Sequence, residues 1–444
     1  MKLELGDVQG LFARGYGDLK SAAFLLLKVE DGAAARRWLG ETSRTITSAQ
    51  DRRPERALNV AFTSSGLERL GLPAEAVAMF SNEFVAGMTT PHRTRILGDV
   101  DENAPARWDW GGPAAPIDAI LLVYARDEGT LAALEGEQTR LLEPGLSVVR
   151  RLGTADLDGF EPFGFRDGIS QPFVEGLGKT GPPEATVRAG EFLLGYENEY
   201  GHTIDQPLLR NGSYLVFRQL RQDVSGFWRF ADEATRRPDG SSDPDARLRL
   251  AAKMVGRWPS GAPLALAPDA DDPSLAEAND FGYHADDPRG ARCPVGSHIR
   301  RSNPRDSLDP DPGSERSFEI NRRHRIVRRG REYGPPLPLE QALVGDDSTE
   351  RGLHFICLNA NIARQFEFVN HTWLNNPKFG ELYDDADPFF APGCFTIPTG
   401  GVRERVTHVP QFVSVQGGAY FFLPSLAALR YLAGLGNVSS PVGS

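Results

Sequence analysis

The sequence predicts an α+β fold made of two repeated units. Short apolar runs of strand length alternate with helical segments, and in the first half their order is strand, helix, strand, strand, helix, strand. The second half repeats the theme, and this order is the ferredoxin-like signature. A chain of 444 residues is also too long for one ordinary single-core domain and comfortable for two. We therefore expect ferredoxin-like domains with antiparallel sheets over residues 1–205 and 206–444.

Four strands and two main helices make up the first unit. Residues 22–29 form an apolar run of strand length, and the segment 33–42, rich in Ala and Arg, has helical composition. Residues 58–63 alternate like a strand, and the two serines before 66–70 cap a short helix that we treat as a connection. The remaining elements follow in order: a strongly apolar strand at 119–125, a helix over 127–137 and a strand at 147–150.

The second unit shows the same alternation. Residues 214–218 and 353–360 have the composition of buried strands, and 224–234 reads as a helix. Four apolar residues fall on one face of a helix over 362–373. The last elements are a hairpin of strands 412–416 and 419–424 around Gly417 and Gly418, and a helix over 425–435.

Between these elements, residues 237–311 are rich in Pro, Gly and Asp. This composition predicts a long insertion or loop. Loops of that length in compact enzymes are often functional.

Composition and charge exclude several classes of protein. Apolar residues make up 40% and charged residues 25%, which is a globular rather than a disordered composition. The 49 basic and 60 acidic residues give a net charge of −11, so the chain repels nucleic acid and anionic membranes on average. No apolar run approaches the roughly 20 residues that span a bilayer, and the N-terminus does not resemble a secretory signal. We expect a cytoplasmic protein without nucleic-acid or membrane partners.

The three cysteines, Cys293, Cys357 and Cys394, give no disulfide framework because their number is odd and their spacing is wide. They form neither a Cys-x-x-Cys zinc motif nor a Cys-x-x-Cys-His haem attachment motif. We expect each of them to be a small buried apolar residue in a reducing compartment.

The segment 161–172 places Asp167 between Gly164 and Gly168 in a stretch without periodicity. Glycines allow a backbone to approach a flat ligand or to adopt a positive φ. A tight surface turn with a capping aspartate explains the same residues. The residues alone leave both interpretations open.

Two further segments concentrate polar residues. In 293–306, His298 stands amid several cations, as either a ligand for iron or zinc or a satisfied surface or core histidine. In 321–334, six residues are arginines, which create a positive local field in an acidic protein. A solvated basic loop explains them equally well, and nucleic-acid binding is a weaker alternative because nothing else in the chain supports it.

Together these segments resemble the dye-decolorizing peroxidase family. The family marker Gly-x-x-Asp-Gly stands at 164–168, the proximal-histidine segment at 298–305 and the distal-arginine segment at 328–333. The length and the long insertions are similar to those of its larger subgroup, which has bacterial and fungal members. Further matching segments, in the family's order, are 6–10, 190–196 and 353–359.

The resemblance implies two ferredoxin-like domains in an α+β-barrel-like arrangement, with one noncovalent haem b between them, bound mostly by the C-terminal one. It implies that His298 is the axial ligand of the haem iron, with its other ring N–H bonded to Asp387. Asp384 and Asp385 are close enough in sequence to compete for that bond. Gly168 and Arg305, which lie in the same motifs, would contact the haem.

The resemblance also assigns the reaction with hydrogen peroxide. Arg328 would stabilise the peroxide anion, and Asp167 would move its proton. Leu353 and Phe355 alternate on one strand and would narrow the distal side to peroxide and water. Bulky dyes would then give their electrons at the surface, where the resemblance makes Trp373 and Tyr333 candidates. A packed helix residue explains Trp373 equally well.

The implied function is a haem peroxidase that oxidises organic reductants such as dyes and phenols. A haem-binding or haem-iron-release protein with incidental peroxidase activity is the alternative, and a homo-oligomer is left open. A basic-loop interaction module conflicts with the net charge of −11. Compact relatives resembling this chain carry Asn two residues after the distal arginine, where Gly330 stands here. The resemblance therefore does not extend to activities that depend on that Asn, such as manganese oxidation.

Overall fold

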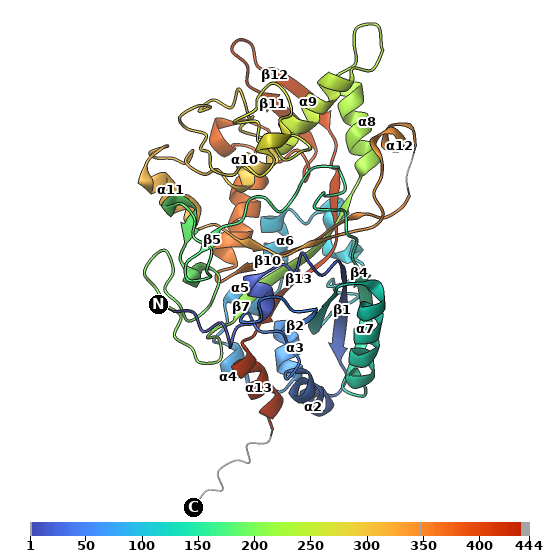
Figure 1. Cartoon of the computed structure of the whole chain (residues 1–444), viewed down its shortest axis with the longest axis vertical. Coiled ribbons are helices and arrows are strands. Elements are labelled where there is room, and N and C mark those ends of the chain that lie inside the picture. The colour runs from blue at the N-terminus through green and yellow to red at the C-terminus, as the bar shows by residue number, and fades with distance from the viewer. Residues whose placement is uncertain (1, 346–347, 437–444) are drawn as a thin grey trace, which may run out of the picture.

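The computed structural model describes residues 2–345 and 348–436, and a nine-stranded antiparallel sheet forms its centre (Figure 1). The strand order is β4-β1-β3-β2-β13-β7-β10-β8, and β9 pairs with β10 beside β8. The strands of this sheet are β1 (Ser21–Val29), β2 (Arg56–Phe62), β3 (Ala119–Ala125), β4 (Leu146–Gly153), β7 (Ser213–Gln222), β8 (Val327–Arg328), β9 (Arg331–Tyr333), β10 (Gly352–Asn359) and β13 (Val413–Leu423).

Each half of the sheet has the same topology. Counted along its own chain, the first half has the order 4-1-3-2 in β4-β1-β3-β2. The second half has the same order in β13-β7-β10-β8 when β8 and β9, which both pair with β10, count as one edge strand. This repeat confirms the predicted α+β class with two ferredoxin-like units. The halves meet edge to edge where Phe62 of β2 pairs with Phe422 of β13. Because the sheet continues through both halves, the boundary at 205/206 stays a prediction.

The two ends of the sheet approach each other without closing into a barrel. Among the described strands, β4 and β8 stand at opposite edges. Two contacts bring the end of β4 back to the second half: His354 Nε2 lies 2.9 Å from the Gly153 carbonyl, and the Ala155 N–H donates to the Glu332 carbonyl at 2.8 Å. The arrangement is therefore a strongly curved open sheet.

Helices cover the sheet in both halves. In the first half, α2 (Gly32–Thr42) packs against both α7 (Glu128–Leu142) and α13 (Leu426–Gly434). In Figure 1, α2 and α13 lie below the strands and α7 stands beside β1. Aspartates cap two of them: Asp31 accepts from Ala34 N–H and Asp127 from Thr130 N–H. In the second half, α8 (Val224–Ala234) contacts both α9 (Pro244–Val255) and α12 (Leu339–Val344).

Short 3-10 helices lie in the connections: η1 (Asp101–Asn103), η2 (Pro105–Arg107), η3 (Pro183–Ala185), η4 (Ala189–Glu191), η5 (Pro273–Leu275) and η8 (Phe379–Glu381). The other elements are also short and connect or flank the sheet. They are α1 (Gly10–Ala13), α3 (Ser64–Arg69), α4 (Ala74–Val77), α5 (Asn82–Ala86), α6 (Pro91–Leu97), α10 (His298–Ser302), α11 (Glu315–Arg322), β5 (Phe173–Val174), β6 (Thr186–Val187), β11 (Gly393–Ile397), β12 (Glu404–Val409), and the π-helices η6 (Ala363–Glu367) and η7 (Val369–Leu374). Across residues 2–345 and 348–436, every helix is too short or too polar to cross a bilayer.

Both faces of the sheet are buried. Along β1, Leu25 and Leu27 belong to the core that holds α2 and α7, whereas Phe24 and Leu26 belong to the core on the opposite face. This alternation is the two-residue period of a strand. A sheet covered on both faces explains why its strands read as continuous apolar runs in the sequence.

Three predicted elements differ from the structure. The first is the hairpin around Gly417 and Gly418, which is wrong because β13 runs through both glycines as one strand with a bulge after Val415. A Cβ atom at Gly417 would lie 2.5 Å from the indole ring of Trp110. The glycines therefore serve a close approach of ring and backbone rather than a turn.

The second difference is the type of helix at 362–373. The segment is helical, but as η6 and η7, and the Glu367 N–H donates to the Ile362 carbonyl five residues back. The wider turn changes which side chains share a face. Phe366 and Val369 line a cavity, whereas Trp373 does not reach it and packs with Val369 and Phe379 in a small core.

The third difference lies in the insertion at 237–311, which is not wholly irregular. It contains α9, whose N-terminus is capped by Asp243 and begins with Pro244, and whose end is marked by Gly256 at φ +100. These are ordinary helix boundary signals. The high content of Pro, Gly and Asp around α9 masked them.

Candidate active site

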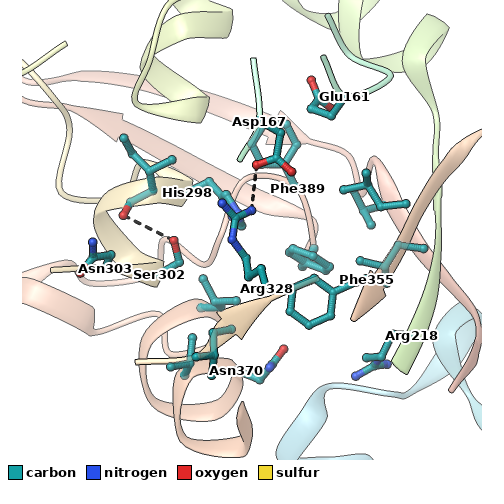
Figure 2. Close-up of a pocket in the computed structure, with 18 of the residues that line it drawn as sticks. Glu161, Asp167, Arg218, His298, Ser302, Asn303, Arg328, Phe355, Asn370 and Phe389 are labelled. Atoms are coloured by element: carbon teal, nitrogen blue, oxygen red, sulfur yellow. Dashed lines mark hydrogen bonds and ion pairs between the residues drawn. The ribbon is translucent and has the colours of Figure 1, made fainter. Parts of the chain in front are cut away.

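A large cavity lies against one face of the second half of the sheet. One side is formed by side chains of β7, β10 and β13, and the other by the loop 161–170, by α10 and by η6 and η7. Segments far apart in the chain thus meet at one place (Figure 2). The predicted site residues in the cavity wall are Asp167, His298, Arg305, Arg328, Leu353 and Phe355.

His298 is the first residue of α10, and a buried carboxylate holds its ring. The Nδ1 atom lies 2.8 Å from Oδ2 of Asp387, whose side chain is fully buried. The other oxygen of Asp387 accepts the Phe389 N–H at 3.0 Å. Burial alone would lower the pKa of His298, but the charge and hydrogen bond of Asp387 outweigh it and raise that pKa. With Nδ1 engaged, Nε2 remains for another partner.

The two competing aspartates lie elsewhere. The Asp384 side chain is about half exposed and pairs with Arg405. The Asp385 carboxylate accepts the Thr396 N–H at 2.5 Å. Of the three candidates, all within the described residues, only Asp387 contacts His298.

Asp167 and Arg328 form an ion pair in the cavity wall, with Nη1 and Oδ1 2.8 Å apart (Figure 2). Both side chains are about one-third exposed, and the cavity lies in front of them. Burial raises the pKa of Asp167, but the charge and hydrogen bond of Arg328 together with the Gly168 N–H lower it further than burial raises it. Asp167 is therefore an ionised carboxylate near neutral pH.

The amide of Gln171 fixes the backbone of Arg328. Its Oε1 accepts the Arg328 N–H at 3.1 Å, and its Nε2 donates to the Arg328 carbonyl at 3.3 Å. Gln171 follows Asp167 by four residues, so one loop supplies both the partner of the guanidinium and the support of its backbone. Sequence analysis missed this role of Gln171, although the residue lies in the segment that drew attention to Asp167.

The two remaining motif residues lie in left-handed backbone conformations. Gly168, at φ +79, turns the chain between the wall residues Asp167 and Ile169. Arg305, at φ +56, donates to the carbonyls of Asn279 and Phe281 and stands 3.8 Å above the Phe281 ring. Its guanidinium is thus fixed, because its planar fork is engaged on several sides. A second wall cation, Arg325, donates to Asn303 at 3.2 Å.

Leu353 and Phe355 lie on the same face of β10 and in the cavity wall, as their alternation predicts. The backbone of the same strand leaves no room for a side chain at Gly330, in the neighbouring β8–β9 connection. A Cβ atom there would lie 2.5 Å from the His354 carbonyl oxygen. An Asn at this position would therefore require the β8–β9 connection to move.

Trp373 and Tyr333 are buried, so their predicted position at the surface is wrong. Their exposed fractions are 4% and 8%. Trp373 packs edge-on against His324 at 5.2 Å, and Tyr333 stacks on His354 at 4.5 Å between ring centroids. Both rings were placed at the surface from family resemblance alone, which carries no information on burial.

Two more polar groups in the wall escaped the sequence analysis. Glu161 accepts hydrogen bonds within the loop that carries Asp167, and Arg218 of β7 forms a buried ion pair with Asp99. Partners 119 residues apart leave no local pattern in the sequence. His324, also in the wall, stacks on Phe368 at 3.8 Å.

The three cysteines are free. Cys293 and Cys357 are buried as expected, and burial raises the pKa of both thiols. Cys357 pairs with Arg328 in the ladder between β10 and β8. Cys394 is only half-buried, which differs from the expectation for all three.

Comparison with known proteins gives a consistent set of relatives, although no protein-family model matches the chain. The chain is 32% identical over 465 residues to the dye-decolorizing peroxidase msp1 of Mycetinis scorodonius, covering 96% of this chain and 87% of the relative. It is 32% identical over 448 residues to a multifunctional dye peroxidase of Amycolatopsis sp., with coverages of 92% and 91%.

Solved structures agree with these relatives. A dye-decolorizing peroxidase in complex with 2,6-dimethoxyphenol superposes with a TM-score of 0.82 at 28% identity, covering 97% of this chain and all of the other. A decolorizing peroxidase from Auricularia auricula-judae gives a TM-score of 0.84 at 26% identity, with the same coverage.

Proposed function

The chain belongs to the dye-decolorizing peroxidase family, and we propose that it is a haem b peroxidase with its cofactor in the cavity between His298 and the Asp167–Arg328 pair. As a member of that family it is an oxidoreductase that uses peroxide. One observation carries the proposal: a carboxylate-held imidazole and a carboxylate–guanidinium pair line the same cavity. We also propose the boundary near 205/206 between its two units.

The residues of the cavity fit a noncovalently bound haem. His298 offers Nε2 to a metal because Asp387 takes the opposite nitrogen, which is the usual support for a metal-bound imidazole. Arg305 and Arg325 supply fixed cations in the wall for the carboxylates of the haem. Apolar side chains suited to the faces of a flat ring are Leu353, Phe355, Phe366, Phe389 and Phe390.

Haem bound in this cavity would supply an iron centre that gives two electrons to peroxide. Two electrons from a reductant would then return it to its resting state. In sum, one peroxide, two electrons and two protons give two water molecules. Asp167 takes the proton from the first peroxide oxygen and delivers it to the second. Arg328 stabilises the negative charge on peroxide and on the departing oxygen, since a guanidinium stays charged at any working pH.

The proposed reductants are organic molecules such as dyes and phenols. The relative solved with 2,6-dimethoxyphenol binds a phenol, and the names of the relatives from Mycetinis scorodonius and Amycolatopsis sp. refer to dyes. Leu353 and Phe355 narrow the cavity beside Arg328, so a bulky dye would deliver electrons from outside it. Trp373 and Tyr333 are the oxidisable rings we propose on that route, now as buried relays rather than surface sites.

The test of this function removes both polar groups of the distal pair. In the double variant Asp167→Ala, Arg328→Leu, haem should stay bound, while the spectral change on mixing with peroxide should slow by about 10⁴-fold, since each group is worth about 10²-fold. The control removes an exposed ion pair of the same kind, Glu102→Ala with Arg107→Leu, and should react at the parent rate. A distal variant that reacts as fast as the parent would favour the haem-carrier alternative, which needs no such pair.

A further inference from the structure

We propose that Glu161 is a positioning residue for the distal site, whose carboxylate, braced by Gln222 of β7, holds the loop that presents Asp167. The proposal rests on the proposed function only for the role of Asp167. We call the Glu161 carboxylate, with its hydrogen bonds to the loop and to Gln222, the clamp. It can be tested without peroxide.

The carboxylate of Glu161 accepts hydrogen bonds from two backbone N–H groups of its own loop. Its Oε1 accepts the Phe165 N–H at 2.9 Å, and its Oε2 accepts the Phe163 N–H at 3.0 Å. The backbone of Glu161 adds two bonds, donating to the Phe165 carbonyl and accepting from the Gly164 N–H, both at 2.8 Å. These bonds close the loop two residues before Asp167, so the direction of the Asp167 side chain depends on them.

Gln222 ties this loop to the sheet. Its Nε2 donates to Oε2 of Glu161 at 2.7 Å, from the last residue of β7. Its Oε1 is buried and has no hydrogen-bond partner within the described residues. A loop that would otherwise be a free turn is thus fastened to the rigid wall of the cavity.

The same loop reaches the other side of the cavity through its phenylalanines. The Phe163 ring lies 5.4 Å from Phe389, which meets the His298 ring edge-on at 5.6 Å. The Phe163 carbonyl also accepts the indole N–H of Trp228 at 3.0 Å. The clamp therefore fixes Asp167 relative to His298. The distance between these two side chains decides whether one ligand can contact both of them.

The charge of Glu161 depends on pH in the working range. Burial raises its pKa to about 7; the hydrogen bonds from Phe165, Gln222 and Phe163 lower it, and the charge of Asp167 raises it. Gln222 and the two backbone N–H groups are neutral, so the charge that acts on Glu161 is that of Asp167, which is itself paired with Arg328. Above pH 7 the ionised carboxylate can accept all three bonds. Below it, the added proton replaces one acceptor position and the clamp loosens.

The first measurement is hydrogen exchange of the peptide that contains residues 160–168, in the full-length protein as purified. Glu161→Gln keeps the size but turns one oxygen into a donor that faces an N–H group. We expect exchange in this peptide to rise at least tenfold at pH 8, and Glu161→Asp to restore part of the protection. Asp118→Asn is the matched control, because Asp118 is a buried carboxylate that accepts the Val29 N–H in the first half of the sheet. Unchanged exchange in Glu161→Gln overturns the proposal.

The second measurement is the rate of the spectral change with peroxide from pH 5 to 9. Glu161→Gln should slow it about tenfold or more at pH 8, because displacing a reacting group by an ångström costs up to about 10²-fold. It should also remove the step near pH 7 that the parent and Asp118→Asn retain. Faster exchange with an unchanged rate would overturn the positioning role of Glu161 if the distal double variant is slow, and the proposed role of Asp167 if that variant reacts as fast as the parent. The two failures are thus distinguishable.

Discussion

The polar side chains of the cavity are individually held by other polar groups. Asp387 holds His298, and Asp167 and Gln171 hold Arg328 at its two ends. A side chain that is already oriented loses less entropy when a ligand arrives and keeps its geometry during the reaction. The cavity is therefore preorganised before it binds anything.

Replacing His298 by Ala should leave a folded protein with little or no haem, because the proposed metal ligand is gone. The cavity contains its own control, since His324 is a second wall histidine. Its Nδ1 is bonded to the Arg364 carbonyl and its ring stacks on Phe368. Haem content after mild purification is the measurement. Haem lost in His324→Ala and kept in His298→Ala would exchange the two roles.

Asp387→Asn should keep haem bound and raise the reduction potential of its iron. A neutral amide accepts the His298 N–H less strongly than a carboxylate, so the imidazole becomes a poorer electron donor. Potentiometric titration measures the effect. Asp384→Asn serves as the control, because that residue pairs with Arg405 away from His298. An equal potential in Asp387→Asn and the parent would contradict the support proposed for the ligand.

The sequence predicts the site residues that lie in ordered motifs, and it misses those defined by contact. Asp167, His298 and Arg328 stand in segments whose spacing is distinctive. Glu161 and Gln222 are 61 residues apart and meet only because β7 passes behind the loop. A contact between residues so far apart in the sequence leaves no local periodicity or composition, so the clamp can be identified only from the structure.

At the scale of elements, the errors come from one ambiguity. Apolar periodicity locates a helical segment but does not distinguish an α-helix from a π-helix. The segment 362–373 is therefore correctly placed but wrongly assigned as an α-helix. Paired glycines mark either a turn or a close contact, and the Trp110 ring, 307 residues before Gly417, decides between them. Buried strands, in contrast, are predicted well because both faces of the sheet are covered and their apolar runs are unbroken.

Trp373, in the π-helix η7, can be replaced to test the proposed electron route. Trp373→Phe keeps most of the packing volume and removes the more oxidisable ring. We expect the reaction with peroxide to be unchanged, turnover of a bulky anthraquinone dye to fall, and turnover of a small phenol to fall less. Trp38→Phe, in α2 of the first half, is a control for the loss of a buried indole.

The ratio of dye to phenol turnover is the deciding quantity for this route. Equal losses for both substrates would indicate a defect in haem binding or folding. An unchanged ratio would make Trp373 a packing residue and leave Tyr333 as the candidate.

At the scale of the whole molecule, His354 links the two halves of the sheet. It lies on β10, donates from Nε2 to Gly153 at the end of β4, and contacts Phe24 of β1 edge-on at 5.6 Å. Burial lowers its pKa to about 4. The folded protein therefore holds it neutral, with its N–H directed at the carbonyl.

This contact predicts how stability depends on pH. Between the unfolded pKa of about 6.5 and the folded value of about 4, the unfolded chain binds the proton and the folded one does not. Stability should therefore fall with decreasing pH in that window, by about 1.4 kcal/mol per pH unit for this group. Denaturant unfolding at pH 7 and pH 5 is the measurement.

His354→Gln keeps a donor for Gly153 and cannot take up the proton. It should lose about 2 kcal/mol less than the parent between pH 7 and pH 5. The exposed His92 is the control, since His92→Gln should follow the parent. A His354 variant with the parent's pH dependence would contradict the neutral buried state.

The burial of two cysteines bears on how long the catalyst survives its own oxidant. Thiolates, not thiols, react with peroxide, and burial keeps Cys293 and Cys357 in the thiol form. Cys357 is the strand partner of Arg328, the residue proposed to stabilise peroxide, and its side chain is fully buried. Damage to sulfur during turnover should thus begin at the half-buried Cys394, in strand β11, and spare the two thiols whose oxidation would disrupt the core.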